Sequence, residues 1–151
     1  MPERDVGEFE SFVRAARPRL IRALAGCRGP EAVDAAAEAL TYAWEHWVEV
    51  SGMANPVGFL YRVGQSRSRP RRVPLLSPPA GIGVPEVEPA LVPALLGLPE
   101  SQRVAVWLVH ACGWTYAEVA EAMGTSVSMV GNHVSRALER LRAALEVNSR
   151  A

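Results

Sequence analysis

The side chains with the clearest chemical use lie near the C-terminal end, on a stretch with the spacing of one long helix. Apolar residues recur there every three or four positions and predict a buried stripe of Val127, Val130, Val134, Ala137 or Leu138, Leu141 and Leu145. The opposite side carries Ser128, Met129, Asn132, His133, Arg136 and Arg140. Short polar and arginine side chains can reach base edges in the major groove, and arginines also hold phosphates. This stretch predicts a DNA-reading helix.

The preceding residues predict the rest of a helix-turn-helix. Thr115 and Glu118 have the spacing of a capping box, in which each side chain accepts a backbone N–H of the first turn. Gly124 stands where a left-handed helix stop is expected, and Ser126 can cap the next helix. The expected apolar side of this short helix consists of Ala117, Val119, Ala120 and Met123. An ordinary three-helix packing unit without a DNA role would show the same pattern.

Composition argues against several other functions. The chain has 151 residues, net charge zero, two cysteines and three histidines without ligand spacing. We find no paired carboxylates, activated nucleophile or phosphate-binding glycine loop, and therefore expect no enzyme, cofactor, metal or small-molecule substrate. No apolar run is long enough to cross a membrane and no signal peptide is evident, so we expect a cytoplasmic protein without a membrane partner. Cys27 and Cys112 lie in apolar contexts and are expected to be buried thiols.

Three helices are expected in the N-terminal part: residues 7–25, with Pro18 as a potential kink, residues 30–48, and residues 57–69 behind an Asn55 cap. The second helix has an expected inner stripe of Val33, Ala36 or Ala37, Leu40, Ala43 or Trp44, and Trp47. Charge is strongly separated here. Residues 31–49 carry five acids and no arginine, whereas residues 51–72 carry five arginines and no acid.

A proline-rich spacer separates this part from the helix-turn-helix. Prolines are so frequent between residues 71 and 88 that neither a continuous helix nor a central strand can form. A short helix is expected around residues 90–96. We therefore predict an all-α protein of two small helical domains, residues 1–70 and 89–151, joined by a semi-extended linker at 71–88.

Segment 98–145 resembles region 4 of bacterial sigma factors of the sigma-70 family, particularly the extracytoplasmic-function (ECF) group. The matching pieces are Leu98-Pro99-Glu100-x-Gln102-Arg103, Gly113-Trp114-Thr115-Tyr116-x-Glu118-Val119-Ala120, and Val130-x-Asn132-His133-Val134-x-Arg136-Ala137-Leu138-x-Arg140-Leu141-Arg142. Helix-turn-helix regulators of the LuxR type share part of this pattern.

The N-terminal part resembles region 2 of the same ECF sigma factors. The matching pieces are Phe9-Glu10-x-Phe12, Pro18-Arg19-Leu20, Asp34-x-x-x-Glu38, Ala43-Trp44, and Asn55-Pro56-x-Gly58-Phe59-Leu60-Tyr61-Arg62-Val63-Gly64. Two resemblances in the right order favour a sigma factor over a regulator, which would lack the first.

The resemblance implies partners and roles. Region 2 would dock on the β′ clamp helices of core RNA polymerase through Asp34 and Glu38. It would meet the −10 promoter element through Tyr61, Arg62, Gln65, Ser66 and Arg69. Region 4 would read the −35 element through Ser128, Met129, Asn132, His133 and Arg136, with Arg140 on a phosphate, while the polymerase β flap holds it. An anti-sigma factor is a further partner common in this group.

Three residues depart from the family pattern. Ala37 and Gly131 stand where polar or basic residues are common, and Gln65 stands where arginine is frequent. They keep two alternatives open: a stand-alone helix-turn-helix regulator, and a degenerate sigma-like protein that acts through protein–protein contacts.

Overall fold

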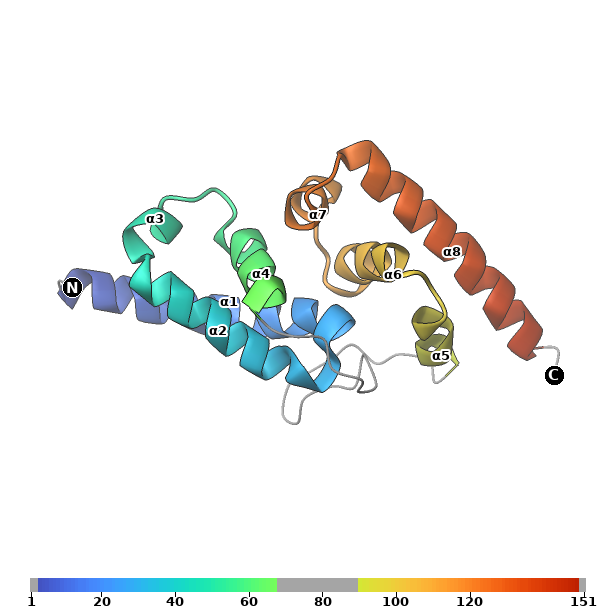
Figure 1. Cartoon of the computed structure of the whole chain (residues 1–151), viewed down its shortest axis with the longest axis horizontal. Helices are drawn as coiled ribbons and strands as arrows, with labels where there is room; N and C mark the ends of the chain where they lie inside the picture. The colour runs from blue at the N-terminus through green and yellow to red at the C-terminus, as the bar shows by residue number, and fades with distance from the viewer. Residues whose placement is uncertain (1–2, 68–89, 150–151) are drawn as a thin grey trace. The chain divides into compact units, whose positions relative to one another are not determined.

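The computed structural model describes residues 3–67 and 90–149 of the chain. Within these ranges every regular element is a helix, which confirms the all-α prediction (Figure 1). The described residues fall into two compact units, one on each side of residues 68–89. The predicted linker at 71–88 lies outside the described residues, and its limits stay a prediction.

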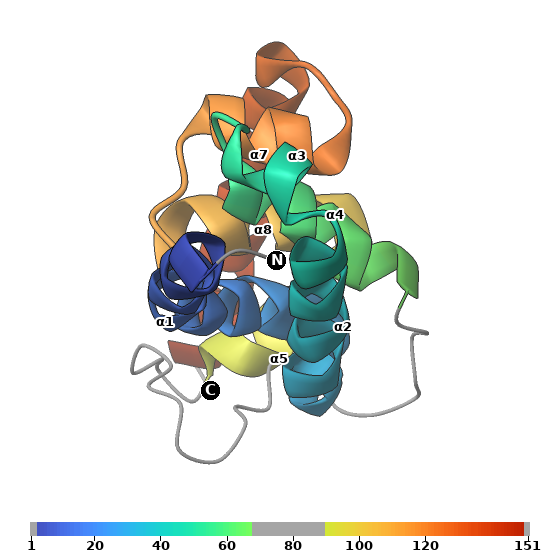
Figure 2. The ribbon, with the colours of Figure 1, turned by 90° about the vertical axis from the view of Figure 1, so that its left-hand side faces the viewer.

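The first unit consists of four helices and a short 3-10 turn. They are α1 (Glu3–Arg28), the turn Gly29–Glu31, α2 (Ala32–Glu45), α3 (Trp47–Ser51) and α4 (Pro56–Arg67). α1, α2 and α4 pack against one another, and α1 and α2 lie side by side in Figure 2. The largest fully buried side chains of this unit are Leu20, Ile21, Leu24, Val50, Leu60 and Tyr61.

Small residues line the contacts between these helices. The buried side of α2 consists of Ala32, Ala35, Ala36, Ala39, Leu40 and Ala43. Gly64 of α4 lies against it, since a Cβ there would stand 3.2 Å from the Ala35 carbonyl oxygen and 3.1 Å from Leu24. Any larger residue at position 64 would push α4 away from α1 and α2. The expected stripe is confirmed at Leu40 and Trp47, and Val33 is half-buried. Of the two pairs of alternatives, Ala36 and Ala43 are the buried members, whereas Ala37 and Trp44 are exposed.

α1 is longer than the sequence indicates. It continues through Pro18 and Gly26 and ends at Arg28, before Gly29 with φ of 53°. The Pro18 ring is on the exposed side, where water can bond the carbonyl that lacks a helical donor. Gly26 is buried, so packing outweighs its low helix propensity.

The predicted helix 30–48 is in fact two helices that meet at His46. This residue has φ of −123° and ψ of 34°, outside the helical region. The bend places Trp47 against Phe9 and Phe12, with ring centroids 5.3 and 5.2 Å apart. This aromatic packing lies between elements distant in sequence and left no signal in the local pattern.

The second unit surrounds one long helix. α8 (Val127–Ser149) packs against α5 (Leu91–Leu96), α6 (Glu100–Val106) and α7 (Tyr116–Met123), and a π-helical turn at Trp107–Ala111 follows α6. The short helix expected at residues 90–96 is present as α5. Val130, Val134, Ala137 and Leu141 form the buried stripe of α8.

The local signals around α7 are all confirmed. The Thr115 hydroxyl accepts from the Glu118 amide at 3.1 Å, and a Glu118 carboxylate oxygen accepts from the Thr115 amide at 3.0 Å. Gly124 has φ of 66°, and the Ser126 hydroxyl accepts from the Met129 amide at 3.1 Å. Asn55 likewise caps α4, because its Oδ1 accepts from the Gly58 amide at 3.1 Å.

Other packing expectations need correction. Ala117 is exposed, Val127 is 51% exposed, and Cys112 is only half-buried, whereas Cys27 is buried as expected. Val127 and Ala117 are in the first turns of their helices, where helical periodicity continues beyond the packed core.

The Thr115→Ala variant tests the capping box. Loss of the hydroxyl acceptor should lower the opening free energy of the α7 amides by about 1 kcal/mol, because the Glu118 N–H loses its partner. Native-state hydrogen exchange measures this directly. Thr41→Ala, which removes an exposed hydroxyl from α2, should leave the α7 amides unchanged. Equal protection of α7 in wild-type and Thr115→Ala proteins would contradict the assignment.

Candidate nucleic-acid interface

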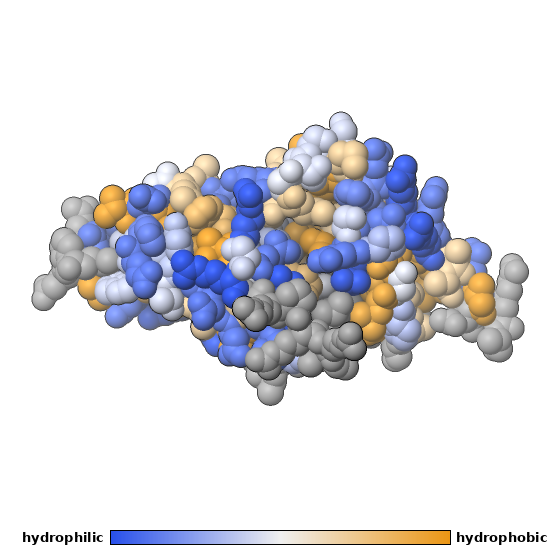
Figure 3. Space-filling view, in the orientation of Figure 1, coloured by the Kyte–Doolittle hydropathy of each residue, from blue (hydrophilic) through white to orange (hydrophobic). Residues whose placement is uncertain are grey.

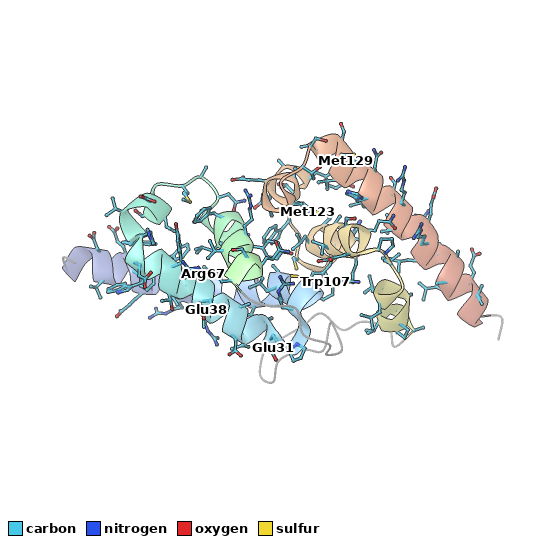
Figure 4. All side chains as sticks on the ribbon, in the orientation of Figure 1. Glu31, Glu38, Arg67, Trp107, Met123 and Met129 are labelled. Atoms are coloured by element: carbon cyan, nitrogen blue, oxygen red, sulfur yellow. The ribbon has the colours of Figure 1, made fainter. Side chains whose placement is uncertain are left out.

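The exposed side of α8 presents most of the residues predicted to read DNA. Ser128, Asn132, Arg136 and Arg140 are exposed, and Met129 is 43% exposed near the start of the helix (Figure 4). His133 is half-buried beside the packed stripe. The predicted residues therefore share the solvent side of one helix.

The exposed surface at the start of α8 also has an apolar part, which the sequence pattern did not indicate. Val127, the first residue of α8, is 51% exposed, and Tyr116, the first residue of α7, is 39% exposed. The Tyr116 ring lies next to Gly131, where an added Cβ would stand 3.8 Å from Tyr116 Cε2. Tyr116, Val127 and Gly131 thus form a small apolar patch at the N-terminal end of α8, which we call the α8 patch.

The predicted −10 surface on α4 divides into exposed and buried residues. Arg62, Ser66 and Arg67 are exposed, whereas Arg69 lies outside the described residues. Tyr61 is 0% exposed in the core between α1 and α4. Its predicted DNA contact was wrong, because a fully enclosed ring cannot stack on a base.

Gln65 also points inward. Its amide nitrogen donates to the Tyr61 hydroxyl at 3.1 Å and to Cys27 Sγ at 3.6 Å, so the side chain joins α4 to α1. The sequence analysis placed Gln65 on the DNA side, and this needs correction. Glutamine in place of the arginine that is frequent at this position in the family therefore takes no charge away from the exposed surface.

A buried arginine ties together the ends of α1 and α4. One terminal nitrogen of Arg28 donates to the Gln65 carbonyl at 2.7 Å, and the other donates to the Cys27 carbonyl at 3.2 Å. Both carbonyls lie in the last turn of a helix, where intrahelical donors are lacking and the helix dipole is negative. Only 9% of Arg28 is exposed, so this contact is shielded from water.

Arg67, the last residue of α4, contacts an aromatic ring of α2. The Arg67 guanidinium carbon lies 5.1 Å from the centre of the Tyr42 ring. Tyr42 in turn stacks on His46, with centroids 4.0 Å apart and planes 17° apart. Contacts from α1 and α2 therefore order the helix end that carries Ser66 and Arg67.

The predicted polymerase-docking residues lie along the exposed side of α2. Asp34 and Glu38 are exposed and one turn apart, with exposed Ala37 next to Glu38 (Glu38 is labelled in Figure 4). The structure shows them accessible on a common side, which a docking surface requires. Their binding to polymerase stays a prediction.

The described residues contain no group of three His, Cys, Asp or Glu side chains placed to hold a metal ion. None of the described helices combines the length and apolar character of a membrane span.

Comparison with known proteins identifies the second unit. Residues 90–141 match the family model described as "Sigma-70, region 4", which covers α5 through most of α8. This segment therefore has the sequence pattern of sigma-70 region 4. A search of curated proteins gave no significant match.

The fold likeness extends beyond region 4. The sigma factor RpoE from Bartonella quintana, solved in complex with the anti-sigma factor NepR, matches with a TM-score of 0.71 at 21% identity. The match covers 93% of this chain and 98% of the RpoE chain. The fold likeness to this solved sigma factor therefore includes the N-terminal helical unit as well as the second one.

Arg28→Met tests whether this arginine orders the end of α4. Loss of a charged donor should lower the opening free energy of the last α4 amides by about 2 kcal/mol, since the Gln65 carbonyl is left without this partner. Hydrogen exchange resolved by residue measures the effect. The matched control is Arg17→Met on the exposed side of α1. Unchanged exchange in α4 would show that Arg28 does not order this turn.

Proposed function

We propose that this chain is an RNA polymerase sigma factor that binds core polymerase and directs promoter-specific initiation of transcription. The supporting observation is the combination of a region 4 sequence match with a sigma-factor fold over both units. A stand-alone helix-turn-helix regulator would need only the second unit. The role is one of binding, and it places the protein in the cytoplasm with the polymerase.

In this proposal α2 docks on the β′ clamp helices of core polymerase. Asp34 and Glu38 supply the charge, and the first half of α2 carries no basic residue that would oppose it. The alanines on the other side of α2 keep the helix close to α1 and α4, so the acidic side stays outward. Exposed Ala37 adds no polar contact, so we expect the two carboxylates to dominate this contact.

The exposed side of α4 would meet the −10 element. Arg62 and Arg67 can neutralise phosphates, and Ser66 lies one turn from Arg62. Arg28 and Tyr42 hold the helix end in place, so these groups are offered in one orientation. Arg69, also assigned to this surface, lies outside the described residues.

Region 4 would read the −35 element with the exposed side of α8. Its five arginines, at 103, 136, 140, 142 and 150, are balanced by glutamates at 100, 118, 121, 139 and 146. Arg103 is buried and donates to the Leu98 carbonyl at 3.4 Å, so it is not offered to DNA. We therefore expect weak binding by region 4 alone and effective binding only when the polymerase β flap holds it.

An anti-sigma factor is a proposed regulator of this chain. The support is that the matching RpoE structure contains one, NepR.

Charge reversal on α2 tests polymerase docking. The double variant Asp34→Arg/Glu38→Arg should lose association with core polymerase in a pull-down, because the charge that the proposed docking face offers to the clamp helices would be reversed in sign. Far-ultraviolet circular dichroism should stay unchanged, since both side chains are exposed. The matched control reverses two exposed acids elsewhere in the unit, Glu10 and Glu49, and should retain core binding. Equal loss in both double variants would remove the proposed face.

Arg62→Gln tests the −10 surface. Loss of one phosphate contact should reduce the salt dependence of promoter binding by about one unit in the slope of log K against log salt. Core binding should stay at the wild-type level, because Arg62 is on α4 and not on α2. Arg19→Gln on exposed α1 is the control. A wild-type salt slope for Arg62→Gln holoenzyme would exclude Arg62 from the DNA contact.

A further inference from the structure

The α8 patch of Tyr116, Val127 and Gly131 has no part in the proposed contacts with polymerase or promoter DNA. It is unusual because region 4 offers large apolar groups where a polar surface is expected. Val127 is 51% exposed and Tyr116 is 39% exposed, although both lie at the well-ordered starts of capped helices. Figure 3 shows pale and orange residues around the α7–α8 turn and blue residues further along α8.

The patch adjoins the residues best placed to read bases. Val127 and Gly131 are one turn apart on α8, and Ser128 and Asn132 form the next such pair around the helix. Val127 continues the line of the buried stripe beyond the packed core and is exposed, Gly131 is half-buried beside it, and Ser128 and Asn132 lie on the solvent side. The first two turns of α8 thus offer a polar pair and an apolar pair on one continuous surface.

Gly131 has no side chain, so the backbone of α8 is less covered at this position. Among the described residues, and apart from the backbone of α8 itself, the atom nearest an added Cβ is Tyr116 Cε2 at 3.8 Å, so a small side chain would fit there. Gly131 thus leaves the α8 backbone without a side chain beside the Tyr116 ring. A flat apolar group can approach α8 closely at this point.

Major-groove chemistry has one apolar group that fits. Among the base edges exposed there, only thymine carries a methyl group, at C5. We propose that Val127 and Tyr116 are specificity-determining residues that bind thymine methyl groups in the −35 element, with Gly131 permitting close approach. This inference rests on the proposed function and names the base that the recognition helix selects.

A protein partner is the competing occupant, and the surroundings favour DNA. The patch has only three residues, whereas a stable protein interface uses about 20–30 residues on each side. It lies at the N-terminus of α8, the end of a recognition helix that contacts base edges. Arg136 and Arg140, exposed further along the same helix, supply phosphate contacts.

The test uses the full-length chain with core polymerase. Promoters are first selected from a randomised library by transcription with this holoenzyme, and thymines of the −35 segment are then replaced by deoxyuridine, which lacks only the methyl group. We expect thymine in the selected segment and about fourfold weaker binding for each contacted methyl removed. Val127→Ala holoenzyme should bind thymine promoters several-fold more weakly and should discriminate little between thymine and uracil.

Val147→Ala is the matched control, because Val147 is a 69% exposed valine at the far end of the same helix. It should keep the wild-type ratio of thymine to uracil binding. Selected promoters without thymine, or equal wild-type affinity for both DNAs, would overturn the inference while leaving the sigma function intact. Loss of core binding in Val127→Ala would instead assign the patch to a protein partner. If no promoter is selected at all, the proposed function itself fails.

Discussion

Close packing through small residues decides which side of each helix remains available for binding. In the first unit α2 presents five alanines and one leucine to its neighbours, and Gly64 brings α4 within van der Waals contact of Leu24 and the α2 backbone. In region 4, Ala105, Ala120, Ala122 and Ala137 are buried in the same manner. The larger, charged side chains are then left on the outer sides, where Asp34, Glu38, Arg62 and Arg136 lie.

Buried polar groups complement this packing at the helix ends. Arg28 bonds the terminal carbonyls of α1 and α4, and Gln65, Tyr61 and Cys27 form a connected group beside it. These contacts convert residues that look like DNA ligands in sequence into parts of the core. Arg62 and Arg67 of α4 stay exposed, and the helix end that carries Arg67 is ordered by Arg28 and Tyr42.

Much of the fold follows from local patterns. The capping box at Thr115, the left-handed Gly124, the Ser126 cap and the Asn55 cap depend on residues within one turn, and all four form as expected. The all-α fold and the region 4 match at residues 90–141 also follow from sequence motifs. The break at His46 was missed because it arises from aromatic contacts between α1 and α3, which local periodicity cannot register.

The surface residues were harder to predict for a related reason. Periodicity places a residue on a side of a helix but does not say where the packed core ends, so Val127 was expected inside and is exposed. It also cannot say which polar side chain finds an inward partner, as Gln65 does. Asp34, Glu38, Ser128 and Asn132 are exposed as expected, because each lies outside the packed stripe of its helix.

Run-off transcription tests the central claim most directly. Purified chain and core polymerase are incubated with a library of genomic promoter fragments, and transcripts are sequenced. If the chain acts as a sigma factor, transcripts start at defined sites and require both the chain and core polymerase. This is the result that the proposed function predicts. The proposed function would be contradicted if no fragment gave a transcript while the chain alone bound a palindromic DNA site as a dimer, since that behaviour belongs to a stand-alone regulator.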